Sequence, residues 1–173
     1  MLAAATLAAT APKAQAQAGV LSGFQIGAAG GVAFPTSDLG DITNTGYNVS
    51  VAVGVRPAYT PIGVRLEAAY NQFNLQGGGG NINIPAFTGN LVYGLPITSF
   101  SPYAIGGAGL YRTGAELNGA GNSAENHFGF NVGGGIKLPL STSFETFIEA
   151  RYNRVTVDGG NISFVPVTIG VMF

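Results

Sequence analysis

The sequence contains no cysteine and no tryptophan, and charged residues make up only 9% of its 173 residues. The absence of cysteine excludes disulfide frameworks, thiolate metal sites and cysteine nucleophiles. Ordinary soluble domains carry about 25% charged residues, so this chain has too few charges to cover a soluble surface. A formal net charge of −1 gives no basic field, which argues against nucleic acid as a partner. No run of roughly 18 or more apolar residues follows the N-terminus, which disfavours a helical membrane protein.

The N-terminal segment differs in composition from the rest of the chain. Ala, Leu and Thr dominate residues 2–11, and Ala alternates with Gln over residues 14–18. Small residues at this spacing are typical of a signal-peptide cleavage site, so we interpret 1–18 as the remainder of a signal peptide and 19–173 as one domain. Lys13 follows the apolar stretch instead of preceding it. A disordered tail rich in Ala and Gln is therefore the alternative interpretation.

From residue 22 onward, apolar residues recur with a period of two, which is the signature of β-strands. The pattern is clearest in two stretches, where every second residue from Tyr47 to Val55 and from Val165 to Phe173 is apolar or aromatic. The opposite face of the first stretch carries small and polar side chains, whereas both faces of the second are uncharged. In all, the pattern predicts eight strands, at residues 22–34, 46–57, 62–74, 87–96, 102–113, 127–138, 143–155 and 162–173.

The connections between these strands differ in composition. Longer loops rich in Gly, Asn and acidic residues are predicted at residues 35–45, 75–86, 114–126 and 156–161. Short turns marked by Pro are predicted at residues 57–61, 96–102 and 139–142. A strict alternation of long and short connections favours an all-β fold, an eight-stranded antiparallel up-and-down transmembrane barrel with its short turns on the periplasmic side. Strands of this length also suffice to cross a bilayer.

The distribution of charge predicts which face of the strands is inside. The following ionic residues fall on the polar faces, among Gly, Ala, Asn and Ser: Arg56, Arg65, Glu67, Arg112, Lys137, Glu145, Glu149 and Arg151. Small residues are expected inside a narrow barrel, so the apolar faces should contact lipid; a soluble lipocalin-like barrel would have the opposite orientation. Buried ions must be paired, which predicts an ionic network that plugs the lumen and a cross-strand pair between Lys137 and Glu145. Separate hydrated pockets are the alternative.

A weak internal repeat relates two of the predicted strands. The segment 65–71, with sequence Arg-Leu-Glu-Ala-Ala-Tyr-Asn, is similar to the segment 147–153, with sequence Phe-Ile-Glu-Ala-Arg-Tyr-Asn. These are the third and seventh strands, which lie on opposite walls of a closed eight-stranded barrel. Glu67 and Glu149 are therefore expected to face each other across the lumen, unless the similarity is a coincidence of composition.

Three motifs carry a resemblance to a known family: residues 87–93 (Phe-Thr-Gly-Asn-Leu-Val-Tyr), 102–112 and the closing segment 166–173. The chain resembles the small outer-membrane β-barrel superfamily, which includes the membrane domain of outer membrane protein A, the outer membrane protein X type and opacity-like proteins. The resemblance implies a location in the bacterial outer membrane and contact with lipid and lipopolysaccharide. It also implies that the barrel-assembly machinery recognises the C-terminal residues Ile169, Val171 and Phe173.

Members of this superfamily carry aromatic girdles at the two membrane interfaces. Without tryptophan, the girdles would depend on tyrosine and phenylalanine, and the tyrosines expected there are Tyr47, Tyr59, Tyr70, Tyr103, Tyr111 and Tyr152.

Some barrels of this kind modify lipid A, and a catalytic group in this chain would consist of His127, Ser123 and Glu125. Deacylase-type barrels carry a serine at the position that Gly129 occupies here, and we predict that the chain is not an enzyme. The glycine-rich stretches lack the features of phosphate loops, and no cofactor or metal is expected. The preferred function is a monomeric structural barrel whose long loops contact a surface ligand, in adhesion or envelope stabilisation. A narrow channel, a ligand-sensing barrel and a lipid A-modifying enzyme are the alternatives.

Overall fold

The computed structural model describes residues 23–57, 60–77, 80–95, 101–117, 123–138, 140 and 143–173, with the side chains of 115–117 and 123–124 excepted. The expected signal peptide lies outside these residues. The elements are β1 (Phe24–Thr36), α1 (Asp38–Ile42), β2 (Gly46–Val55), β3 (Ile62–Asn74), β4 (Gly80–Gly94), β5 (Ser101–Leu117), β6 (Ser123–Leu138), β7 (Glu145–Val157) and β8 (Gly160–Met172). Among the described residues, no helix has the length and apolar character needed to cross a membrane.

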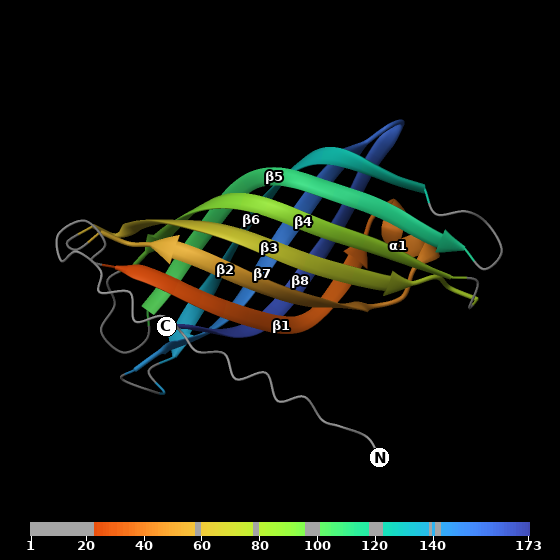
Figure 1. Cartoon of the computed structure of the whole chain (residues 1–173). Helices are drawn as coiled ribbons and strands as arrows, with labels where there is room; N and C mark the ends of the chain where they lie inside the picture. The colour runs from red at the N-terminus through yellow and green to blue at the C-terminus, as the bar shows by residue number, and fades with distance from the viewer. Residues whose placement is uncertain are drawn as a thin grey trace, which may run out of the picture.

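The eight strands form one closed antiparallel barrel in which each strand pairs with its neighbours in the sequence (Figure 1). The barrel closes because β1 pairs with β8. Backbone hydrogen bonds extend this closure to Phe173, whose N–H donates to the Ile26 carbonyl at 2.8 Å and whose carbonyl accepts from the Ile26 N–H at 3.1 Å. The predicted fold, an eight-stranded up-and-down barrel, is confirmed.

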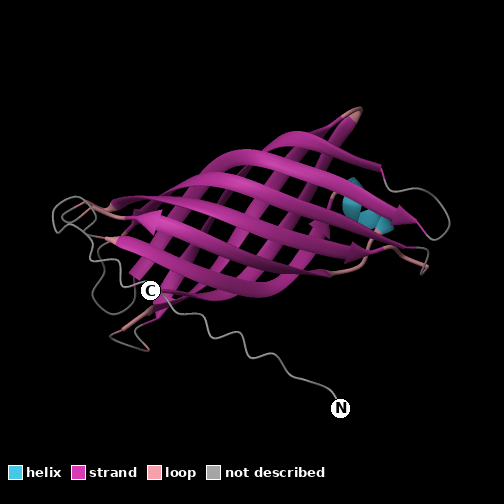
Figure 2. Ribbon diagram, in the orientation of Figure 1, coloured by secondary structure: helices cyan, strands magenta, loops and turns pink. Residues whose placement is uncertain are grey.

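The two ends of the barrel differ. The end where β1 begins and β8 finishes is called the terminal end, and the opposite end, which holds α1, is called the far end (Figure 2). The predicted loops at the far end are too long, because β4, β5 and β6 continue into 75–86 and 114–126 and pair with one another there. Segment 156–161 is likewise mostly strand, with a tight turn at Asp158 and Gly159, whose φ is 86°.

Consequently, the predicted alternation of long and short connections is wrong. The far-end connections are 37–45, 75–79, 118–122 and 158–159, and those at the terminal end are 56–61, 95–100 and 139–144. The reason is physical: glycine and asparagine at the far end are compatible with paired strands when the partner strand completes their hydrogen bonds. The Asp-Gly pair at 158–159 is itself a strong two-residue hairpin signal.

The outer and inner walls of the barrel show an inverted distribution of polarity. Outward side chains are apolar and exposed, for example Val51 at 59% and Leu91 at 61%. Inward side chains are buried and often polar, for example Asn90 and Asn131, each at 2% exposure. Because an apolar exterior with a polar interior is the reverse of a soluble barrel, the predicted lipid-facing orientation follows from the structure.

Candidate functional site

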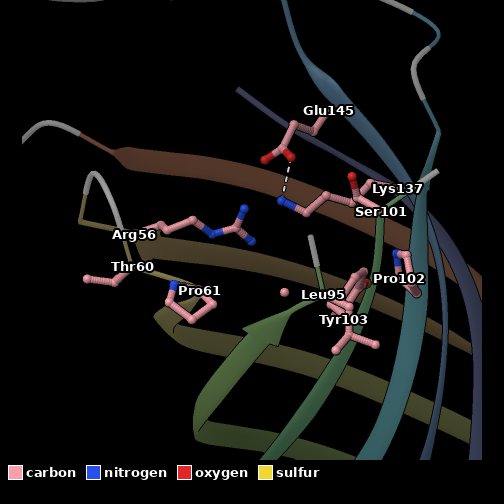
Figure 3. Close-up of a pocket in the computed structure, with 10 residues that line it drawn as sticks. Arg56, Thr60, Pro61, Leu95, Ser101, Pro102, Tyr103, Lys137 and Glu145 are labelled. Carbon is pink, nitrogen blue, oxygen red and sulfur yellow. Dashed lines mark hydrogen bonds and ion pairs between the residues drawn. The ribbon is translucent and has the colours of Figure 1, made fainter. Parts of the chain in front are cut away.

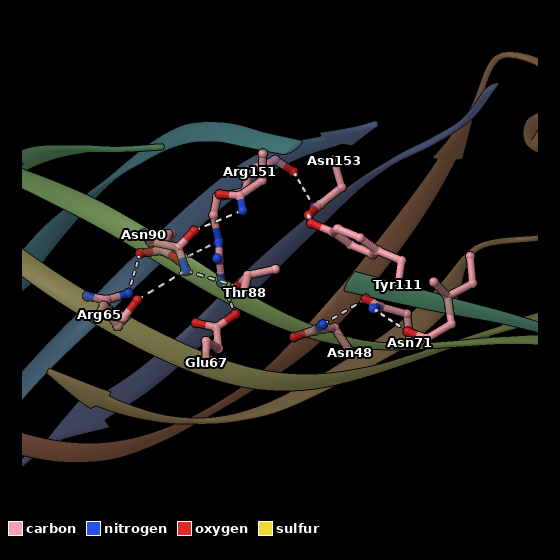
Figure 4. Close-up of polar contacts among 12 residues, drawn as sticks. Asn48, Arg65, Glu67, Asn71, Thr88, Asn90, Tyr111, Arg151 and Asn153 are labelled. Carbon is pink, nitrogen blue, oxygen red and sulfur yellow. Dashed lines mark hydrogen bonds and ion pairs between the residues drawn. The ribbon is translucent and has the colours of Figure 1, made fainter. Parts of the chain in front are cut away.

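The centre of the lumen holds four paired ionic residues from β3 and β7, two strands that run in the same direction across the barrel. Arg65 Nη1 lies 2.8 Å from Glu149 Oε2, and the Arg151 guanidinium pairs with Glu67. Arg151 Nε also lies 2.8 Å from Glu149 Oε1. The four side chains therefore form a continuous chain in the order Glu67, Arg151, Glu149, Arg65. Figure 4 shows Glu67, Arg151 and Arg65 of this chain.

This chain of ions, called the central network, is neutral and almost dry. Its residues are between 2% and 8% exposed, and two cations balance two anions. The Tyr103 hydroxyl donates a further hydrogen bond to Glu149 Oε2 at 2.7 Å. The Arg65 guanidinium carbon also lies 5.3 Å from the centre of the Phe147 ring and 5.7 Å from that of Tyr103. Opposite charge, hydrogen bonds and aromatic faces together offset the cost of removing these ions from water.

Amide side chains extend the polar layer, with Asn90 level with Arg65 and with Asn48, Asn71 and Asn153 on the far-end side of the central network (Figure 4). The Asn131 amide donates to Asn90 Oδ1 at 2.8 Å, and the Asn48 amide donates to Asn71 Oδ1 at 2.7 Å. The Tyr111 hydroxyl donates to Asn153 Oδ1 at 2.9 Å. The prediction of site residues missed this layer, because it considered only charged side chains. Inward asparagines at alternate strand positions are the signal that could have identified it.

Apolar side chains close the lumen at the far end. Phe73 and Phe164 pack edge to face with ring centres 5.5 Å apart, and Ile84 and Val155 lie beside them. Leu39 from α1 joins this cluster at 3% exposure, so the short helix serves as an apolar cap. Thr43 fixes the end of the helix, because its hydroxyl donates to the Leu39 carbonyl at 2.7 Å.

A second apolar cluster closes the lumen on the terminal-end side of the central network. Its buried members are Ala52, Val92, Tyr103, Ile105, Phe147 and Met172. Around Glu67 and Arg151, the remaining cavity measures about 10 Å³. A cavity of that size holds about one water molecule. In the described part of the chain, the lumen is thus filled by an apolar layer, a polar layer and a second apolar layer.

The terminal end of the lumen opens into a cavity of about 480 Å³, which we call the vestibule (Figure 3). Arg56, Lys137 and Glu145 line it, with Tyr103 at its inner side. Lys137 forms an ion pair with Glu145, and the Gln25 amide donates to the same carboxylate. The structure therefore brings together the two residues expected to pair near the inner turn.

Arg112 is a correction, because its side chain is exposed on the outer wall and takes no part in the lumen. Its neighbour Tyr111 points inward and is 1% exposed. The inward face of β5 contains Gly107 and Gly109, so the two faces of that strand could not be distinguished by the size or polarity of their side chains. Seven of the eight predicted lumen residues line the lumen or its vestibule, and Arg112 does not.

The predicted tyrosine girdle also needs correction. Tyr103 and Tyr111 are buried in the lumen, at 4% and 1% exposure. Their rings cover inward glycines: a Cβ added to Gly129 would lie 2.8 Å from Tyr111 Cε2, and one added to Gly135 would lie 2.6 Å from Tyr103 Cζ. Glycine thus makes room for each tyrosine.

Other tyrosines of the predicted girdle are less buried than Tyr103 and Tyr111 or are exposed on the outer wall. Tyr47 is exposed on the outer wall, and its ring lies 6.3 Å from that of half-buried Tyr70. Tyr152 is half-buried and donates to Ser163 Oγ at 2.9 Å, whereas Tyr59 lies outside the described residues. Phenylalanines such as Phe87 and Phe128 are also exposed on the outer wall.

His127 has no catalytic arrangement among the described side chains. Its Nε2 lies 3.8 Å from Glu125 Oε2, which is too long for a hydrogen bond, and Glu125 is 69% exposed. The side chain of Ser123 lies outside the described set. Within the described part of the chain, no group of three or more His, Asp or Glu residues is placed to hold a metal ion.

The residues expected to form an assembly signal lie on the outer wall at β8 and just beyond it. Phe173 is 63% exposed and Ile169 is 57% exposed, while Val171 is half-buried. The Phe173 ring lies 5.5 Å from that of Phe144. Recognition of these residues by the assembly machinery stays a prediction.

Comparisons with known proteins agree with this geometry. Neisserial surface protein A is 20% identical over 87% of this chain and 96% of its own, with a TM-score of 0.71. OprG from Pseudomonas aeruginosa is 14% identical over 87% of this chain and 96% of its own, with a TM-score of 0.59. The outer membrane enzyme PagL is 14% identical over 86% of this chain and 98% of its own, with a TM-score of 0.53.

These similarities show a shared fold. A search of curated proteins finds no match. The family model described as "Outer membrane protein beta-barrel domain" matches residues 1–173, and this match extends over the whole chain. The chain therefore belongs to the outer membrane protein beta-barrel domain family and is a protein of the bacterial outer membrane.

Proposed function

We propose that the protein is a closed scaffold of the outer membrane, which presents its far end at the cell surface and conducts no solute. The filled lumen carries this proposal. Along the barrel axis, the central network lies between two apolar layers. Leu39 belongs to the far-end layer, Arg151 to the central network and Phe147 to the terminal-end layer. Water-filled porins have far more strands and a wide polar channel, whereas an eight-stranded barrel is just wide enough for its side chains to fill.

The far end supplies the surface for contact with a partner. Its exposed acidic residues are Asp38, Asp41, Glu125 and Asp158. They lie on α1, at the start of β6 and in the β7–β8 turn. An acidic surface favours a partner with a basic contact region. Neisserial surface protein A, which shares the fold, is by its name a surface protein.

We propose further that the chain is monomeric and has no enzymatic activity, with its outer wall in contact with lipid and lipopolysaccharide. PagL shows that this fold also supports an enzyme. Gly129, however, lies two residues after His127 on the same face of β6. Deacylase-type barrels carry a serine at this position. A side chain there would meet the Tyr111 ring and the Arg154 carbonyl, the latter 2.7 Å from an added Cβ. The packing of Tyr111 therefore opposes a nucleophile at this position.

The absence of cysteine from the sequence permits a direct test of surface presentation. Asp158→Cys places one thiol in the far-end turn, and Thr60→Cys places one at the terminal end, where Thr60 is exposed. A bulky, membrane-impermeant maleimide should label the Asp158→Cys variant in intact cells. It should label the Thr60→Cys variant only after the outer membrane is permeabilised. Labelling in the reverse order would contradict the proposed orientation.

A further inference from the structure

The vestibule contains a cation that the structure leaves unbalanced. Lys137 is paired with Glu145, and the central network above the vestibule is neutral. Arg56 is half-buried at the mouth, and its guanidinium points into the cavity (Figure 3). Among the described residues, its side chain has no hydrogen-bond or ion-pair partner. The three ionic residues that line the vestibule therefore carry a net charge of +1.

We propose that the vestibule is a binding site for a small oxyanion, a carboxylate or phosphate group, with Arg56 as its principal ligand. The planar guanidinium presents N–H donors in a fork that matches two oxygens of such a group. The Lys137 ammonium projects into the same cavity and supplies a second cation (Figure 3). The low-dielectric barrel wall concentrates the field of both cations in the cavity.

The size and shape of the vestibule suit a small ligand. Its volume of about 480 Å³ lies within the range of about 300–1,000 Å³ that is typical of small-molecule sites. The second apolar cluster, which includes Tyr103 and Ile105, closes its inner side, so the ligand enters and leaves at the terminal end. The oxyanion is therefore a ligand of a blind pocket and not a solute in transit.

Glu145 lowers the affinity of this site for an oxyanion, whereas Arg56 raises it. Its carboxylate holds the Lys137 ammonium and repels an incoming anion. Glu145→Gln removes one negative charge, which raises the net charge of the lining from +1 to +2 and leaves Lys137 free to bind the ligand. Arg56→Gln lowers that net charge to zero and removes the charged donor.

The experiment is a calorimetric titration of the refolded barrel in detergent with inorganic phosphate. We expect saturable binding that Arg56→Gln weakens roughly tenfold or more, since a hydrogen bond to a charged group contributes on that order. Glu145→Gln should strengthen binding several-fold. Arg154→Gln, an equal change of charge at an exposed residue of the outer wall, should leave it unchanged.

A second series distinguishes the source of the oxyanion. A short peptide with a free C-terminal carboxylate is compared with its C-terminal amide in the same titration. Binding of the free peptide alone identifies a peptide carboxylate, and binding of phosphate alone identifies a phosphate compound. Unchanged heat-dependent mobility in SDS shows that each variant is folded. The inference is overturned if neither probe binds saturably, or if folded Arg56→Gln binds as the parent does.

Discussion

Removal of Arg151 gives the sharpest test of the energetics of the lumen. Arg151 is the only described residue that pairs with Glu67, whereas Glu149 keeps Arg65 and the Tyr103 hydroxyl after Arg151 is lost. Arg151→Met therefore leaves one buried carboxylate, Glu67, without a partner. Breaking a buried ion pair in this way costs about 3–5 kcal/mol of unfolding free energy.

A second substitution should reverse most of this loss. Arg151→Met combined with Glu67→Leu removes the unpaired carboxylate and leaves the neutral pair of Arg65 and Glu149 intact. Replacement of a buried ion pair by apolar side chains is often close to neutral, so the double variant should lose about 1 kcal/mol or less. Arg154→Met, at an exposed residue near the far end of β7 without a partner in the described structure, is the matched control and should change stability by less than about 1 kcal/mol.

The assay is reversible urea unfolding in lipid vesicles, followed by far-ultraviolet circular dichroism and by mobility in SDS. Tryptophan fluorescence cannot be used, because the chain contains no tryptophan. The reasoning would be refuted if the single and double variants lost the same stability, because the loss would then arise from packing at position 151. It would equally be refuted if Arg151→Met were as stable as the parent.

Two further predictions concern packing in the barrel. Gly107→Ala should lower stability by about 1–3 kcal/mol, because an added Cβ would overlap the Gly89 carbonyl and the Asn90 amide. Its control, Gly106→Ala, meets no atom closer than 3.6 Å and should unfold at the same or a slightly higher urea concentration; equal losses would contradict this account. Leu39→Ala should release α1 and accelerate hydrogen exchange at Thr43, whose N–H donates to the Leu39 carbonyl at 3.0 Å. Unchanged exchange there would show that Leu39 does not hold the helix.

The fold could be predicted from the sequence because, in most strands, apolar side chains recur at every second position and these side chains face outward. From Tyr47 to Val55, every second side chain is large and apolar, and the structure exposes those side chains on the outer wall. The facing arrangement of β3 and β7 also followed from the geometry of a closed eight-stranded barrel. Arg65 and Glu149 share the same separation in sequence, 84 residues, as Glu67 and Arg151.

Other parts of the lumen could not be predicted from local patterns. Both faces of β5 contain small residues between Gly106 and Gly109, so side-chain size does not alternate there. For this reason the predicted face of Arg112 is wrong. The burial of Tyr103 depends on the space above Gly135 on the neighbouring strand, which is a property of strand register. The cap formed by Leu39 depends on how a five-residue helix folds back over the barrel.

The most direct test of the closed scaffold is a conductance recording of the purified, refolded monomer in a planar lipid bilayer. Heat-dependent mobility in SDS first shows that the protein is folded, and an open porin inserted under the same conditions is the positive control. The filled lumen predicts no stable single-channel steps above the noise of the bilayer at either polarity. Reproducible, large and long-lived conductance steps from the folded monomer would contradict the closed lumen and, with it, the scaffold proposal.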